Sequence, residues 1–124
     1  MTEEGQIILF PFPYTDQSAG KLRPALVLRR CPGAHNDWLI CMISSQLHHE
    51  LGGIDEVLRT TDADFDRTGL KLPSVIRITR LAVVADDLLQ GAIGTIGEPR
   101  LTRIRQRLAQ WLSSGNAQRG IAPR

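Results

Sequence analysis

The stretch KLRPALVL, residues 21–28, joins an arginine–proline pair to a run of strand-forming apolar residues. The preceding PFPYTDQSAGK, residues 11–21, is rich in proline and small polar residues, which do not continue a central strand. QIILF, residues 6–10, is another short apolar run before it. The first 28 residues therefore predict a strand, a loop and a second strand that opens on a cation.

Further apolar runs of strand length follow, separated by polar or glycine-bearing breaks. They are WLICMIS (38–44), IDEVLRT (54–60) and LPSVIRITRLAVV (72–84), with the glycine-rich QGAIGTIG (90–97) expected as a bent strand leading out of the sheet. In the longest run, side-chain alternation places Arg77 with Thr79 on one face and Ile78 with Arg80 on the other. DADFDRTG (62–69) predicts a helical turn capped by Asp62 and ended by Gly69.

One amphipathic helix is expected at the end of the chain, from Glu98 to Gly115. Its apolar stripe consists of Leu101, Ile104, Leu108, Trp111 and Leu112. Five or six short strands with one terminal helix predict a mostly β (α+β) fold, a small, strongly curved antiparallel barrel closed by the helix. We expect one domain over residues 1–115 and a disordered tail over 116–124.

Composition limits the class of protein. The chain has 124 residues, of which 42% are hydrophobic, and its net charge is +2. It contains no apolar run of membrane-spanning length, and its first residues, MTEEGQ, are acidic, so we expect no membrane span, no signal peptide and a cytoplasmic location. Cys31 and Cys41 are expected to be reduced. Their spacing to His35 and His48 matches no standard zinc pattern, so no metal or other cofactor is predicted.

Charge is unevenly distributed along the chain. Six acids and one arginine lie between Glu50 and Asp66, whereas six arginines and no acid follow Glu98. This pattern predicts either one acidic and one basic side of the molecule or two solvated faces. The helix arginines spread around the predicted helix, which favours solvation over a nucleic-acid groove. His48 and His49 are expected to be loop residues rather than a catalytic base.

Together these motifs resemble the PemK/MazF toxins. GQIILFPFPYTDQSAGKLRPALVL is similar to the N-terminal hairpin of that family, and CMISSQ, LPSVIRITRLAVV, GAIGTIG and LTRIRQRLAQWL follow in the order and spacing of its later strands and helix. The resemblance covers residues 5–113. It implies an SH3-like barrel that forms a homodimer, a metal-independent endoribonuclease that cleaves single-stranded RNA at short sequences, and a cognate antitoxin through which alone DNA is contacted.

The resemblance also implies site residues. A ribonuclease without a metal must remove the ribose 2′-hydroxyl proton, protonate the 5′-oxygen and stabilise the charge on phosphorus. Arg23 matches the active-site arginine of the family's RP motif, and a guanidinium suits phosphate oxygens. Ser44 aligns with the hydroxyl residue that ends the third strand, and Arg77 with an arginine beside the scissile phosphate. These three are the expected catalytic residues, and the expected substrate-binding residues are Tyr14, Gln17, Lys21, Ser45, Thr79 and Arg80.

Two departures from the family pattern leave the general base and acid unassigned. Thr79 and Arg80 stand where many relatives have an acid followed by glutamine, and the first loop lacks the histidine of some members. One alternative is therefore a catalytically impaired RNA-binding or antitoxin-binding module of the same fold. Another is a DNA-directed role of the barrel as a corepressor in the toxin–antitoxin complex.

Overall fold

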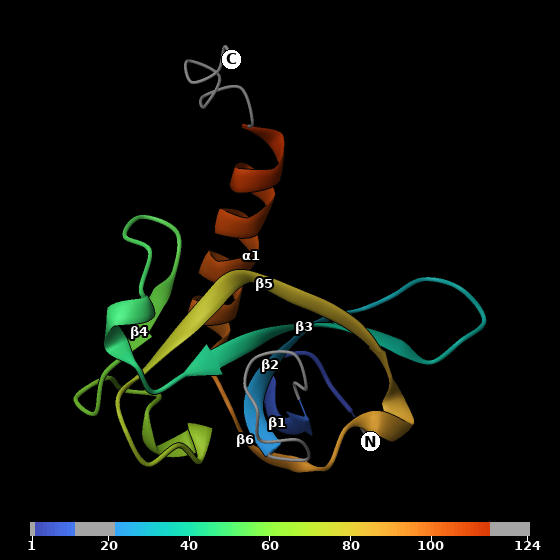
Figure 1. The fold of residues 1–124 in the computed structure, drawn as a ribbon, viewed down its shortest axis with the longest axis horizontal. Coiled ribbons are helices and arrows are strands. Elements are labelled where there is room, and N and C mark those ends of the chain that lie inside the picture. The colour runs from blue at the N-terminus through green and yellow to red at the C-terminus, as the bar shows by residue number, and fades with distance from the viewer. Residues whose placement is uncertain (1, 12–21, 115–124) are drawn as a thin grey trace.

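A computed structural model describes residues 2–11 and 22–114 of the chain. In these ranges six antiparallel strands form one strongly curled sheet of order β4-β5-β3-β2-β1-β6, with a single α-helix after the last strand (Figure 1). The strands are β1 (Gln6–Pro11), β2 (Leu22–Arg30), β3 (Asp37–Ser44), β4 (Glu56–Leu58), β5 (Ser74–Ala85) and β6 (Ala92–Thr95). The helices are η1 (Leu47–His49), η2 (Asp66–Thr68), η3 (Asp86–Leu88) and α1 (Glu98–Ser113). The predicted mostly β fold with a terminal helix is confirmed.

Alternation of side chains divides the core between the two faces of the sheet. On one face Ile7, Leu26 and Cys41 belong to a buried cluster that α1 completes with Leu101, Ile104 and Leu108. On the other face a second cluster contains Ile8, Phe10, Ala25, Val27, Trp38, Ile40, Met42 and Val84. The described part of α1 contributes nothing to this second cluster, which the curled sheet encloses with its own strands.

Helix α1 packs on the sheet with only the first part of its predicted stripe. Leu101, Ile104 and Leu108 are buried, whereas Trp111 and Leu112 are 40% and 65% exposed. The helix ends at Ser113, and the predicted terminator Gly115 and the predicted tail lie outside the described residues. None of the described helices has both the length and the apolar character that a membrane crossing requires.

Strand β6 does not lead out of the sheet as predicted, because it pairs antiparallel with β1 and forms one edge. Helix η2 packs directly against it. Glycine permits this approach, since a Cβ at Gly69 would overlap the carbonyl oxygen of Ile93, and one at Gly94 would overlap that of Arg67. Gly69 has φ +75° and ends the η2 turn as predicted, but the turn begins at Asp66 without a side-chain cap from Asp62.

Two arrangements were predicted for the charged runs, and the separation into an acidic and a basic side is not the one found between β4 and α1. The acidic segment around β4 lies against α1, where Arg100 is only 8% exposed. Its guanidinium binds Glu56 (Nη1 to Oε1, 2.8 Å), Asp62 (Nη2 to Oδ2, 3.0 Å) and Asp64 (Nε to Oδ2, 2.9 Å). Hydrogen bonds from Arg100 lower the pKa of Asp64 to about 2. The opposite charges neutralise one another because folding brings the two segments together.

A bulge interrupts β5 where it pairs with β3. Cys41 and Met42 are consecutive on β3, but their partners on β5 are Leu81 and Arg77. Residues 78–80 therefore have no partner in β3, and an odd number of extra residues exchanges the two faces of the strand beyond them. The bulge also frees the backbone N–H of Ile78, which donates to Oδ1 of the buried Asp55 at 3.1 Å.

Candidate functional site

Strand register brings the three expected catalytic residues to one face of the sheet. Met42 of β3 pairs with Ala25 of β2 on one side and with Arg77 of β5 on the other. Directly paired residues share a face, and so do residues two apart along a strand. Arg23, Ser44 and Arg77 consequently lie on the face of the second core cluster, beside Met42.

The proline of the RP pair opens the sheet at this point. Pairing of β2 with β3 ends at Ala25 and Met42, while Pro24 and Arg23 pair only with β1. Proline has no N–H to donate to a second neighbour, so its position just beyond the last β3 pair fits its chemistry. The ends of β2 and β3 are thus free to separate, with Arg23 on one and Ser44 on the other.

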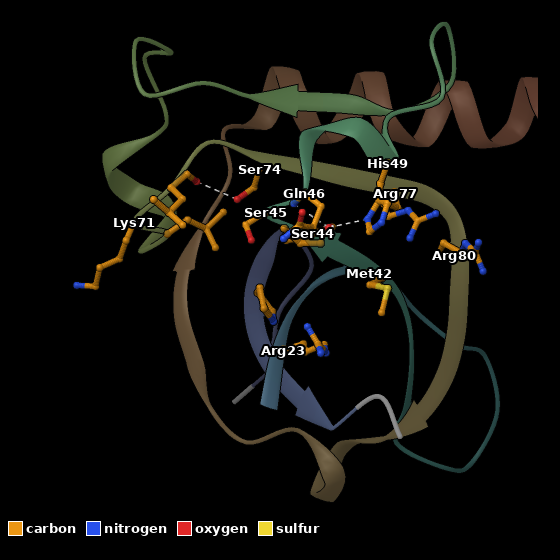
Figure 2. A pocket seen from close by; sticks show the side chains of 14 residues that line it. Arg23, Met42, Ser44, Ser45, Gln46, His49, Lys71, Ser74, Arg77 and Arg80 are labelled. Atoms are coloured by element: carbon orange, nitrogen blue, oxygen red, sulfur yellow. Dashed lines mark hydrogen bonds between the residues drawn. The ribbon is translucent and has the colours of Figure 1, made fainter. Parts of the chain in front are cut away.

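A cavity of about 720 Å³ lies at this opening (Figure 2). Its described lining carries four cationic side chains and no carboxylate, and comprises Arg23, Pro24, Met42, Ile43, Ser44, Ser45, Gln46, His49, Leu70, Lys71, Leu72, Ser74, Arg77 and Arg80. Hydroxyl, amide and imidazole groups stand between the cations. Such a lining suits a polyanion whose phosphates need charge stabilisation.

The structure separates the expected substrate-binding residues into three groups. Ser45 and Arg80 line the cavity with the catalytic candidates. Thr79 does not, because the β5 bulge turns Arg80 rather than Thr79 to the side of Arg77, contrary to the predicted alternation. Tyr14, Gln17 and Lys21 lie outside the described residues.

Ser44, the last residue of β3, has two hydrogen-bond partners. Its Oγ lies 2.9 Å from Nδ1 of His49 and accepts the backbone N–H of Gln46 at 3.0 Å (Figure 2). The 3₁₀ turn η1 brings His49 back over the strand end and leaves its ring half-buried. The serine is therefore held by His49, one of the two histidines that the sequence predicts as loop residues rather than a catalytic base.

The surroundings of His49 disfavour its charged form. Burial lowers the pKa of its imidazole, and the positive charges of Arg77, His48 and Arg80 lower it further. A neutral ring keeps one nitrogen lone pair available. A sequence signal for this residue exists in SSQLHHE, residues 44–50, where a strand-ending serine is followed within one turn by histidine.

Comparison of the sequence with protein families identifies the class. The chain matches the model of the PemK-like, MazF-like toxins of type II toxin–antitoxin systems over residues 3–112. The chain belongs to this family, as its motifs suggested. A search of curated proteins finds no match.

Solved structures share the fold. An endoribonuclease in complex with its cognate antitoxin, from a mycobacterial species, is 14% identical with a TM-score of 0.67, over 92% of this chain and 97% of that one. The toxin MazF-mt6 of Mycobacterium tuberculosis is 16% identical with a TM-score of 0.62, over 86% and 95%. The MazE–MazF structure from Deinococcus radiodurans is 18% identical with a TM-score of 0.64, over 90% and 95%. At these identities the likeness establishes the curled-sheet fold alone.

The contact between Asp55 and the β5 bulge generates a stability prediction. Asp55 also accepts the N–H of Leu51 at 2.9 Å through Oδ2, so its two oxygens satisfy two backbone donors. In Asp55→Asn the carboxamide offers one oxygen, which leaves one donor facing an N–H group. We expect the free energy of unfolding, measured in urea, to fall by about 1–3 kcal/mol. The exposed control Glu50→Gln should change it by less than about 0.5 kcal/mol, and equal unfolding midpoints for the two variants would refute the role given to Asp55.

Proposed function

We propose that the protein is the toxin of a toxin–antitoxin pair and an endoribonuclease that cleaves single-stranded RNA without a metal ion. The observation that carries the proposal is the cavity that brings Arg23, Ser44 and Arg77 together within a lining of four cations and no described carboxylate. Family membership and the fold shared with an endoribonuclease support the same reaction.

Each residue has a role that fits its chemistry. The 2′-oxygen attacks the adjacent phosphorus, the 5′-oxygen leaves, and the phosphoryl oxygens gain negative charge in the transition state. Arg23 and Arg77 come from different strands, so their guanidiniums can bind that charge from two directions. Ser44 places a hydroxyl between them, and Arg80 and Ser45 extend the polar surface for the rest of the strand.

The described lining residues are not of the type that usually binds a catalytic magnesium ion. Magnesium in nucleases is held by carboxylate oxygens, together with substrate phosphate. The described cavity residues supply arginine, lysine, serine, glutamine and histidine instead. Charge stabilisation is therefore assigned to the guanidiniums.

The first test of this function is cleavage in EDTA. We expect purified protein to cut a long single-stranded RNA in excess EDTA and to leave 2′,3′-cyclic phosphate and 5′-hydroxyl ends, because the nucleophile is the ribose 2′-oxygen. Polynucleotide kinase should label the new 5′ ends without prior phosphatase treatment. Loss of cleavage in EDTA and its recovery in magnesium, while the protein stays folded, would contradict the mechanism.

The second test separates catalysis from binding. Arg23→Ala and Arg77→Ala should each slow cleavage by two to three orders of magnitude, since transition-state stabilisation of about 3–4 kcal/mol is lost. RNA binding should weaken modestly, and its salt dependence should fall by about one unit of slope. The matched control is Arg29→Ala, which removes an exposed arginine from the same strand, outside the cavity. Equal losses of binding and cleavage would favour the alternative of a catalytically impaired RNA-binding module.

The family resemblance also suggests a homodimer in which RNA lies across two barrels. We expect sedimentation equilibrium at micromolar concentration to give twice the 13.8 kDa mass of one chain. One cavity of about 720 Å³ holds only a few nucleotides, so a longer strand needs a neighbouring surface. A fully active monomer would contradict this arrangement.

A cognate antitoxin is the remaining proposed partner, supported by the neighbours solved as toxin–antitoxin complexes. An acidic or apolar antitoxin segment suits the cationic cavity, where it would exclude RNA. We place the protein and its antitoxin in the cytoplasm, where the RNA substrate is. DNA would be contacted through the antitoxin only, and an assembly that represses transcription without any RNA cleavage would favour the corepressor alternative.

A further inference from the structure

We propose that His49 is the general base of this site and that it takes the proton of the ribose 2′-hydroxyl through Ser44. The inference rests on the proposed ribonuclease function and names a residue for a step that the family pattern leaves unassigned here. Its geometric basis is the 2.9 Å contact between Ser44 Oγ and His49 Nδ1 in the wall of the cavity (Figure 2).

The hydrogen-bond capacity of Ser44 gives the direction of the transfer. A hydroxyl has one proton to donate and two lone pairs that accept. One lone pair accepts the backbone N–H of Gln46, a donor that cannot be reversed. When Nδ1 of His49 carries no proton, the hydroxyl proton of Ser44 is donated to it. The second lone pair of Ser44 then remains as an acceptor for a substrate hydroxyl.

The charges around His49 favour this starting state. Arg77 and Arg80 face it from β5, His48 adjoins it on η1, and Arg23 and Lys71 line the same cavity. No carboxylate occurs in the described lining to stabilise an imidazolium. Burial and these cations lower the pKa of His49, which favours the neutral form of its ring. It is the one described lining residue whose ordinary pKa lies near neutrality.

The proton transfer balances. The 2′-hydroxyl gives its proton to Ser44 Oγ while the hydroxyl proton of Ser44 moves to Nδ1 of His49. The 2′-oxygen forms a bond to phosphorus, the bond from phosphorus to the 5′-oxygen breaks, and the 5′-oxygen takes a proton from water. The products are a 2′,3′-cyclic phosphate, a 5′-hydroxyl, an imidazolium and a hydroxide ion. The imidazolium then returns its proton to solvent, which neutralises the hydroxide.

A pH profile tests the role of His49. At RNA concentrations below saturation, the wild-type cleavage rate should fall tenfold per pH unit below the pKa of His49, because the protonated ring accepts no proton. His49→Gln should reduce the rate at pH 7.5 by about 100-fold or more and abolish this acid limb. The matched control His48→Gln, which removes the exposed neighbouring ring, should keep the rate at pH 7.5 and retain an acid limb, displaced only slightly to higher pH.

Two further variants distinguish a base from a structural histidine. Arg80→Gln should move the acid limb to higher pH, because removal of a positive charge raises the pKa of His49. Added imidazole should restore part of the activity of His49→Ala but not of Arg23→Ala. Thermal unfolding of each variant checks that it is folded. An acid limb that persists in His49→Gln, with a rate within threefold of wild type, would overturn the proposal.

Nitrogen NMR provides a readout that does not require cleavage. The His49 signal is assigned by its absence from His49→Gln, and the chain has only three histidines. We expect Nδ1 to be unprotonated at pH 7 and the pKa to lie below about 6.5, and we expect Ser44→Ala to shift the Nδ1 resonance. A neutral ring with its proton on Nδ1 would overturn the role proposed for His49 and leave the proposed ribonuclease function standing. A wild type that binds RNA without cutting it would overturn the proposed function, and the role of His49 with it.

Discussion

The candidate site depends on the three-residue bulge in β5. Without it, strict alternation would place Arg80 on the face that α1 covers, and Arg77 would be the only β5 arginine in the cavity. Residues 78–80 give up pairing with β3 and a buried N–H is freed, for which Asp55 supplies the acceptor. A carboxylate outside the cavity lining thus maintains the backbone geometry that positions two cations. The same carboxylate binds Leu51, so it also ties the segment after His49 to the strand that bears Arg77.

Much of the fold could be predicted from local patterns, because apolar alternation identifies a strand wherever its neighbours lie. The RP pair, the runs around Val27 and Ile40, and the stripe through Leu101 all formed the elements that their patterns indicate. The bulge could not be predicted in this way. Alternation reports the period of a strand, whereas register depends on what the adjacent strand and the loop at Asp55 provide. The assignment of Thr79 and Arg80 to faces failed for this reason.

The contacts of charged and titratable groups likewise depend on neighbouring segments and not on the local sequence pattern. The acidic segment and the arginines of α1 stand out in the sequence. A sequence does not say, however, whether two oppositely charged segments that lie far apart in the chain come into contact in the folded protein. In the structure they meet at Arg100, across 36 to 44 residues of chain from Glu56 and Asp64. His49 is a comparable case on a shorter scale. Its chemistry arises from a 3₁₀ turn that returns it to Ser44, five residues earlier. The acids that neutralise α1 lie away from the cavity, and none of them belongs to its described lining.

The position of β6 and α1 in the strand order has a consequence for synthesis on the ribosome. The first strand, β1, has the sixth as one of its two neighbours, and the cluster around Leu26 and Cys41 is completed by residues of α1. These partners are the last elements of the fold to be translated. A nascent chain that has emerged as far as β5 already carries Arg23, Ser44 and Arg77, but its helix-side core remains open to water and β1 lacks an edge partner. Because such long-range contacts form late, we expect the sheet and its helix-side core to close only once β6 and α1 are available to pair and pack.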